Sequence, residues 1–124
     1  MKHLGRINVL GELVGVVLGT IDDFSDTDMS ENVCASYDGK ENVIRINVER
    51  SKSPGQARGN LLHELVHAWF RISGARYFLS TQMPKFSTEA LDEVEETLVR
   101  MLTPAIDSSF DDLEKILRTG KAHK

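Results

Sequence analysis

The chain has 124 residues, of which 40% are hydrophobic and 27% are charged, and its formal net charge is −4. This length suits one domain with one core, and the composition is that of an ordinary globular protein. Lys and Arg form no basic stripe, which argues against a nucleic-acid surface, and the single cysteine excludes an intrachain disulfide.

The apolar run from Val9 to Leu18 follows a basic N-terminal segment, which is the order found in a secretory signal peptide. Glu12 interrupts the run, however, and Asp22 and Asp23 stand where a small-residue cleavage site is expected. The run is also shorter than the roughly 20 residues that span a bilayer. We therefore expect a cytoplasmic protein with no membrane association.

Residues 1–50 have the pattern of a sheet. The segments 6–10 and 13–20 are rich in Val, Ile and Leu and are punctuated by glycines, which predicts two strands. The acidic, apolar-poor stretch 22–32 is expected to be a surface loop, because it lacks the spacing of a calcium-binding loop.

Asp38-Gly39 predicts the turn of a β-hairpin between the segments 33–37 and 42–48. In the second arm Ile44, Ile46 and Val48 share one face, as the two-residue period of a strand requires.

The second half of the chain is predicted to be helical. Ser53-Pro54-Gly55-Gln56 combines an N-cap serine, a proline in the first turn and a capping-box glutamine. This pattern predicts a helix over 54–73 that stops at Gly74.

An irregular connection is expected over 75–86. Ser87 or Thr88 should cap a second helix over 88–103, which Pro104 should end. A third helix is expected over 108–119. Strands followed by helices, with no linker, indicate a single α+β domain over 1–124.

The first predicted helix contains His63-Glu64-Leu65-Val66-His67. Histidines four residues apart fall on one face, so both imidazoles can bind one ion, and zinc suits such ligands. Glu64 projects beside them, where it can act as general base toward a water on the metal. This spacing therefore predicts a zinc-dependent hydrolase with His63 and His67 as metal ligands and Glu64 as the catalytic residue.

The rest of this helix supports the prediction. One broad face gathers apolar side chains and the histidines lie nearly opposite, so they line a helix that buries its other side. The apolar set is Leu61, Leu62, Leu65, Trp69 and Ile72.

A catalytic zinc site usually has three protein ligands, so a third is expected. His3 and His123 lie in the terminal segments and are poor candidates, whereas the second helix is rich in acids. Glu93 and Glu95 flank its apolar face on opposite sides, and periodicity does not choose between them. Asp92 and Glu96 are expected to point outward, and Glu96 should pair with Arg100. The apolar face is Ala90, Leu91, Val94, Leu98, Met101 and Leu102.

With these residues placed, the chain resembles the small gluzincin zinc peptidases, and among them the ImmA/IrrE-like metallo-endopeptidases common in phages and mobile elements. The matching segments are Leu18-Gly19-Thr20-Ile21-Asp22, Val43-Ile44-Arg45-Ile46-Asn47, Leu61-Leu62-His63-Glu64-Leu65-Val66-His67-Ala68 and Asp92-Glu93-Val94.

The resemblance implies a small zincin-like fold, with a twisted sheet of three or four strands and three helices, the first two carrying one Zn²⁺. It also favours Glu93 as the third ligand, because the family's ligand precedes a small or apolar residue, here Val94.

The resemblance further implies hydrolysis of a peptide bond in a protein substrate, such as a repressor, bound as an added strand along the hairpin 33–48. Tyr77 is a candidate helper for the carbonyl oxygen. Two alternatives stay open: a catalytically idle, metal-containing module that binds a protein, and a hydrolase of non-peptide amides.

Overall fold

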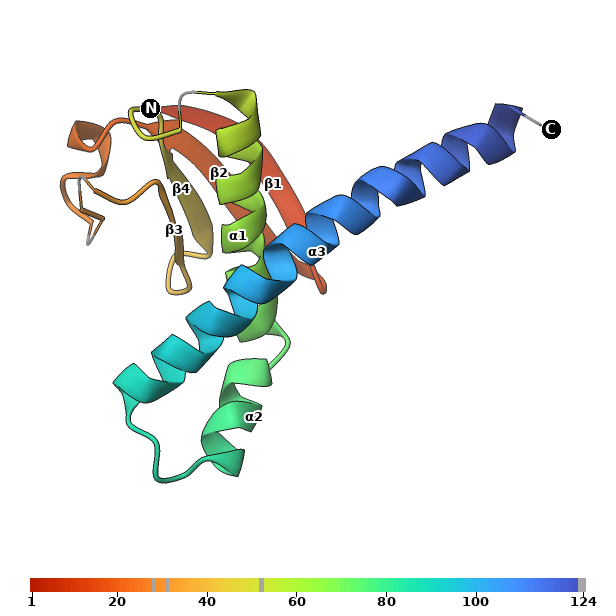
Figure 1. Cartoon of the computed structure of the whole chain (residues 1–124). Helices are drawn as coiled ribbons and strands as arrows, with labels where there is room; N and C mark the ends of the chain where they lie inside the picture. The colour runs from red at the N-terminus through yellow and green to blue at the C-terminus, as the bar shows by residue number, and fades with distance from the viewer. Residues whose placement is uncertain (28, 31, 52, 123–124) are drawn as a thin grey trace.

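The computed structural model describes residues 1–27, 29–30, 32–51 and 53–122 and has the expected α+β architecture, in which a sheet of four strands precedes three helices (Figure 1). The elements are β1 (Lys2–Val9), β2 (Glu12–Gly19), the 3-10 helix η1 (Asp22–Phe24), β3 (Ala35–Asp38), β4 (Val43–Asn47), α1 (Pro54–Ile72), α2 (Ala75–Gln82) and α3 (Thr88–Ala122). The predicted loop 22–32 thus contains a short helical turn, and its Asp28 and Glu31 lie outside the described residues.

The sheet is mixed and has the strand order β1-β2-β4-β3. β1 pairs with β2, and β3 with β4, as antiparallel neighbours, so the predicted hairpin 33–48 is present. The two pairs are joined through β2 and β4, which run parallel. β3 is consequently an edge strand, as expected for part of the hairpin 33–48.

Helix α1 covers one face of the sheet, and together they form the core (Figure 1). Ile44 and Ile46 are buried there, whereas Val48 follows the end of β4 and is 38% exposed. The buried core consists of Val9, Val14, Val16, Ala35, Ile44, Ile46 and Ala68, and Leu61, Leu65 and Ile72 of α1 pack against it. Of the predicted apolar face, Trp69 differs, because it is 44% exposed.

The start of α1 follows the predicted capping chemistry. The Ser53 hydroxyl oxygen accepts a hydrogen bond from the Gln56 backbone N–H at 3.1 Å, and the Gln56 side-chain oxygen accepts one from the Ser53 N–H at 3.3 Å. The helix ends at Ile72, one residue earlier than predicted, and Gly74 turns the chain with a φ of 83°. Glycine adopts this left-handed conformation without the steric penalty that other residues incur.

The prediction of an irregular connection over 75–86 is wrong in its first part, because residues Ala75–Gln82 form α2. This helix has no buried residue. It spans only eight residues, fewer than the roughly 11–18 over which helical periodicity is recognised.

The predicted break at Pro104 is also wrong, since α3 continues through this proline to Ala122. A proline inside a helix removes one backbone hydrogen bond and costs about 3 kcal/mol. Contacts lie on both sides of Pro104: the earlier part of α3 packs on α1, and Arg58 of α1 pairs with Asp107 and Asp111 beyond it. The start is as predicted, since the Ser87 hydroxyl accepts from the Ala90 N–H at 3.1 Å.

Candidate metal centre

The two histidines of the His-Glu-Xaa-Xaa-His segment meet a carboxylate where α3 crosses α1. Glu96 places one oxygen 2.9 Å from His63 Nε2 and the other 2.8 Å from His67 Nε2. One atom of each residue lies within 4.8 Å of the other two, and all three side chains are partly buried. The metal group therefore spans α1 and α3, which contain the two segments predicted to carry it, 54–73 and 88–103, with α2 between them in the chain.

These three residues fit a metal ion. Zinc holds imidazole nitrogens and carboxylate oxygens at 2.0–2.2 Å, so neighbouring ligand atoms around a tetrahedral ion lie about 3.4 Å apart. The nitrogen–oxygen distances of 2.8 and 2.9 Å need only a small widening to reach that separation. His63, His67 and Glu96 could thus hold one divalent ion.

The predicted third ligand, Glu93, is not brought to the histidines: it is exposed on α3 and does not belong to this group. Leu91, Glu95 and Val99 mark the buried face of α3, and Glu93 lies about 160° around the helix from Glu95. The prediction placed the apolar face wrongly because it included Met101 and Leu102, which are 69% and 39% exposed.

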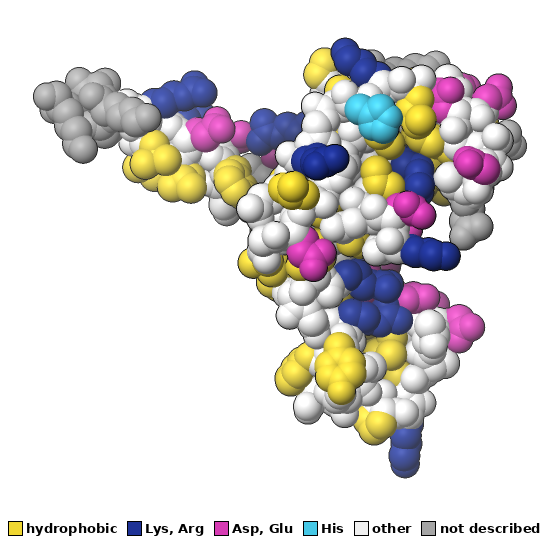
Figure 2. Space-filling view, turned by 180° about the vertical axis from the view of Figure 1, so that it is seen from behind, with side chains coloured by type: hydrophobic (Ala, Val, Ile, Leu, Met, Phe, Trp, Pro, Cys, Tyr) yellow, Lys and Arg dark blue, Asp and Glu magenta, His cyan; other side chains and the backbone are white. Residues whose placement is uncertain are grey.

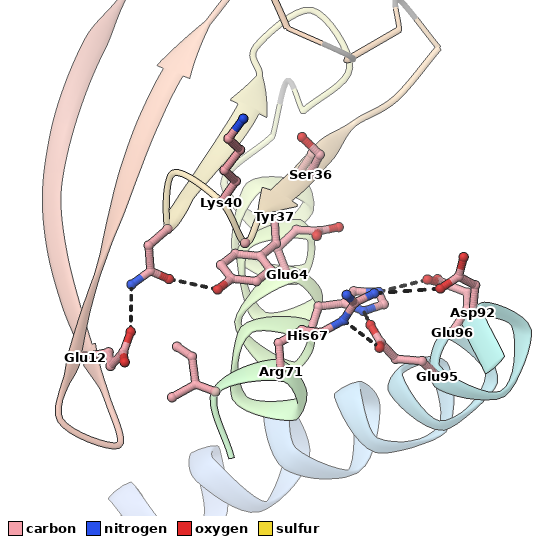
Figure 3. A pocket seen from close by; sticks show the side chains of 14 residues that line it. Glu12, Ser36, Tyr37, Lys40, Glu64, His67, Arg71, Asp92, Glu95 and Glu96 are labelled. Carbon is pink, nitrogen blue, oxygen red and sulfur yellow. Dashed lines mark hydrogen bonds and ion pairs between the residues drawn. The ribbon is translucent and has the colours of Figure 1, made fainter. Parts of the chain in front are cut away.

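Glu95, the other acid that flanks the predicted apolar face, is buried at 3% exposure. One carboxylate oxygen lies 2.6 Å from His67 Nδ1 (Figure 3). The other accepts hydrogen bonds from Arg71 Nε at 2.9 Å and from Arg76 Nη1 at 3.1 Å. A buried carboxylate is tolerated when it is paired in this way. Burial opposes ionisation, but the bonds from His67 and the arginines outweigh it and hold the pKa of Glu95 below its usual range.

The two histidines have different electrostatic environments. Burial lowers the pKa of His63. Burial acts in the same direction on His67, but its hydrogen bond to Glu95 and the nearby carboxylates raise the pKa of His67 overall. Both nitrogens of His67 face acids of α3: Nδ1 faces Glu95 and Nε2 faces Glu96.

Glu64 lies on α1 between the histidines and lines the same cavity as His67 (Figure 3). Burial raises the pKa of the Glu64 carboxyl to about 7, although the positive charge of His67 and a hydrogen bond from the Tyr37 backbone act in the opposite direction. Glu64, the predicted catalytic residue, thus lies beside the metal group and is not one of its three residues.

A cleft passes on both sides of the metal group. One cavity of about 1010 Å³ contains His67 and extends toward Tyr37 and Glu12, and another of about 610 Å³ contains His63 and extends toward Cys34 and Arg100. Ala35 of β3, Glu64 and Glu96 line both cavities. The cleft therefore follows the edge strand β3 across α1.

The structure does not bring Tyr77 to this site. Tyr77 lies on α2, is 75% exposed and lines neither cavity. Tyr37 of β3 lines the cleft instead, and its hydroxyl donates to Asn42 Oδ1 at 2.8 Å. The strand period could have indicated this residue, because Tyr37 shares a face with Ala35.

The remaining predictions concern the termini and the membrane. His3 lies in β1 and is not part of the metal group, and His123 lies outside the described residues. No helix in the described part of the chain is long and apolar enough to cross a membrane.

Comparisons with protein-family models, with curated proteins and with solved structures found no match. A function for the chain is therefore inferred from the arrangement of its own side chains.

Proposed function

We propose that this protein is a zinc-dependent peptidase that hydrolyses a peptide bond in a protein substrate. The observation that carries the proposal is the position of the His63, His67 and Glu96 group in an elongated cleft, with Glu64 beside it and the edge strand β3 along it.

Zinc is the proposed ion because two imidazoles and one carboxylate form a ligand set typical of catalytic zinc. A structural zinc site usually has four protein ligands, whereas three residues gather here among those described. A bound ion with one open position would polarise the scissile carbonyl and lower the pKa of water to about 7.

Glu64 is proposed as the proton carrier. It accepts a proton from the attacking water as the new carbon–oxygen bond forms, and it returns this proton to the amine nitrogen as the carbon–nitrogen bond breaks. His63, His67 and Glu96 hold the ion and do not exchange protons with the substrate. Glu64 is half-buried and lines both cavities.

The substrate is proposed to bind in extended form along β3. This strand pairs with β4 on one side only. On its other side the Tyr37 backbone bonds to Glu64, and an added strand would pair with the remaining backbone groups. A cleft that continues on both sides of the metal group suits a polypeptide better than a small amide. The family resemblance, rather than any residue of the cleft, favours a cytoplasmic regulatory protein such as a repressor as the substrate.

Substitution of Glu64 by Gln separates this proposal from an idle binding module. We expect E64Q to retain one zinc per chain, measured by atomic absorption, and to lose hydrolysis of any peptide that the wild type cleaves. The matched control is E93Q, which removes an exposed carboxylate from α3 and should leave both properties unchanged. Equal cleavage by E64Q and the wild type would refute the assigned base.

Cys34 offers a test of the cleft, because it is exposed, lines the same cavity as His63 and is the only cysteine. We expect alkylation of Cys34 with a bulky maleimide to block peptide hydrolysis without releasing zinc. C34S treated with the same reagent should keep its activity. Full activity after complete labelling would show that substrate does not occupy this part of the cleft.

A further inference from the structure

Helix α2 reaches the metal centre through Arg76. Its guanidinium lies 2.7 Å from Asp92 Oδ1 and 3.1 Å from Glu95 Oε1, and it donates to the Thr88 carbonyl at 3.3 Å. The Arg76 side chain is only 15% exposed, although no residue of α2 is buried. This side chain therefore joins α2 to the first turns of α3.

Glu95 connects Arg76 to the metal group. Arg71 and Arg76 occupy one of its oxygens, and His67 Nδ1 occupies the other. A carboxylate accepts from Nδ1–H, and this bond leaves the Nε2 lone pair of a neutral imidazole free for a metal. His67 Nε2 is the nitrogen that faces Glu96.

We propose that Glu95 is a positioning residue for His67 and that Arg76 makes helix α2 part of this support. The inference rests on the proposed metal site and not on peptide hydrolysis. Glu95 fixes which nitrogen of His67 carries the proton and how the ring is turned, while Arg76 fixes Glu95. Loss of such a supporting group typically weakens metal affinity 10–100-fold.

The first test compares E95A with E93A, which removes the same charge from an exposed position on the same helix. Zinc affinity is measured by competition with a chromophoric chelator. We expect E95A to bind zinc about 10–100-fold more weakly and E93A to match the wild type. If E95A binds zinc with wild-type affinity, Glu95 pairs with Arg71 and Arg76 without positioning His67, and the inference is overturned.

The second measurement reports on His67 directly. In the zinc-loaded wild type, the Nδ1–H of His67 should give a slowly exchanging signal in ¹H–¹⁵N spectra, because Glu95 shields and accepts this proton. E95A should lose the signal or exchange it rapidly with water. A purely structural role for Glu95 predicts no such change, so an unaltered signal would contradict the proposal.

The third test addresses α2. We expect R76M to lower zinc affinity several-fold, whereas R118M, in which an 81% exposed arginine of α3 is removed, should have no effect. Equal affinity in R76M and the wild type would exclude α2 from the support of the metal site.

Removal of a buried charge can prevent folding, so E95D and R76K serve as milder variants. E95D keeps the charge but is one methylene shorter, and it cannot hold His67 and both arginines at their present distances. We expect a smaller loss of zinc affinity in folded E95D, and wild-type affinity there would overturn the inference. If the wild type binds zinc but cleaves no peptide, the proposed function fails while the effect of Glu95 on affinity still stands.

Discussion

The two halves of α3 have the same backbone conformation but very different surroundings. Before Pro104 the helix crosses α1, buries Leu91 and Val99 and brings Glu95 and Glu96 to the histidines. After Pro104 it projects away from the rest of the molecule (Figure 1). Figure 2 shows hydrophobic side chains gathered along this projecting end, where Phe110, Leu113, Ile116 and Leu117 are 49–67% exposed.

This contrast shows that an amphipathic sequence pattern predicts a helix but does not predict which element packs against its apolar face. Both halves carry apolar residues at helical spacing, yet the buried Leu91 and Val99 lie in the first half, whereas the large apolar side chains named above for the second half are exposed. A buried acid such as Glu95 occurs where a second helix excludes water, and the projecting half lacks that condition. Four experiments test the difference, in order of decreasing expected effect.

The largest effect is expected from removal of the carboxylate that faces both histidines. E96A should weaken zinc binding at least about 100-fold, because two imidazoles alone do not complete a stable site. E93A is the control from the same helix and should bind zinc normally. The measurement is chelator competition at constant pH. If E93A loses more zinc affinity than E96A, Glu93 rather than Glu96 is the third ligand.

Next, the two halves of α3 should differ in their contribution to folding. L91A removes a side chain that is 7% exposed and should lower the free energy of unfolding by about 2–4 kcal/mol. L117A removes the same atoms from a side chain that is 56% exposed and should cost less than about 0.5 kcal/mol. Urea denaturation measures both values. Equal losses would show that the projecting half is covered in solution.

The pH dependence of stability should also reside near the first half of α3. The pKa of Glu64 is about 7 in the folded, metal-free protein and 4.5 as its ordinary value, so ionisation of Glu64 destabilises the fold as pH rises from about 5 to 8. E64Q should therefore stabilise the metal-free protein by about 1–3 kcal/mol at pH 8 and by much less at pH 5.

The control for this experiment is E114Q in the projecting half, where the carboxylate is 63% exposed. It should change stability little at either pH. A stabilisation by E64Q that is independent of pH would contradict the assigned pKa.

The smallest effect is expected from the ion pairs that attach the projecting half. Arg58 lies 2.7 Å from Asp107 and 2.9 Å from Asp111, but these three side chains are 39–56% exposed. R58M should lower the free energy of unfolding by less than about 1 kcal/mol, and the loss should shrink at high salt. A large loss that is insensitive to salt would indicate a packing role for Arg58.

Local signals in the sequence predicted the elements that depend on neighbouring residues. The capping box at Ser53, the Asp38-Gly39 turn and the His63 and His67 spacing each act over a few residues, and the corresponding elements are present. The prediction failed where a distant segment decides the outcome. Arg58 of α1 pairs with α3 beyond Pro104, and the crossing of α1 and α3 brings Glu96 rather than Glu93 to the histidines.

The parallel pairing of β2 with β4 has a consequence for the order of folding. The β1–β2 and β3–β4 hairpins join segments that are close in sequence, so each can form quickly. Joining them requires Gly15 to pair with Val43 and Gly19 with Asn47, across intervening chain that loses entropy when the loop closes. We therefore expect β3 to take its place beside the cleft after the two hairpins have formed. Mutations that weaken the β2–β4 contact should delay formation of the cleft more than that of either hairpin.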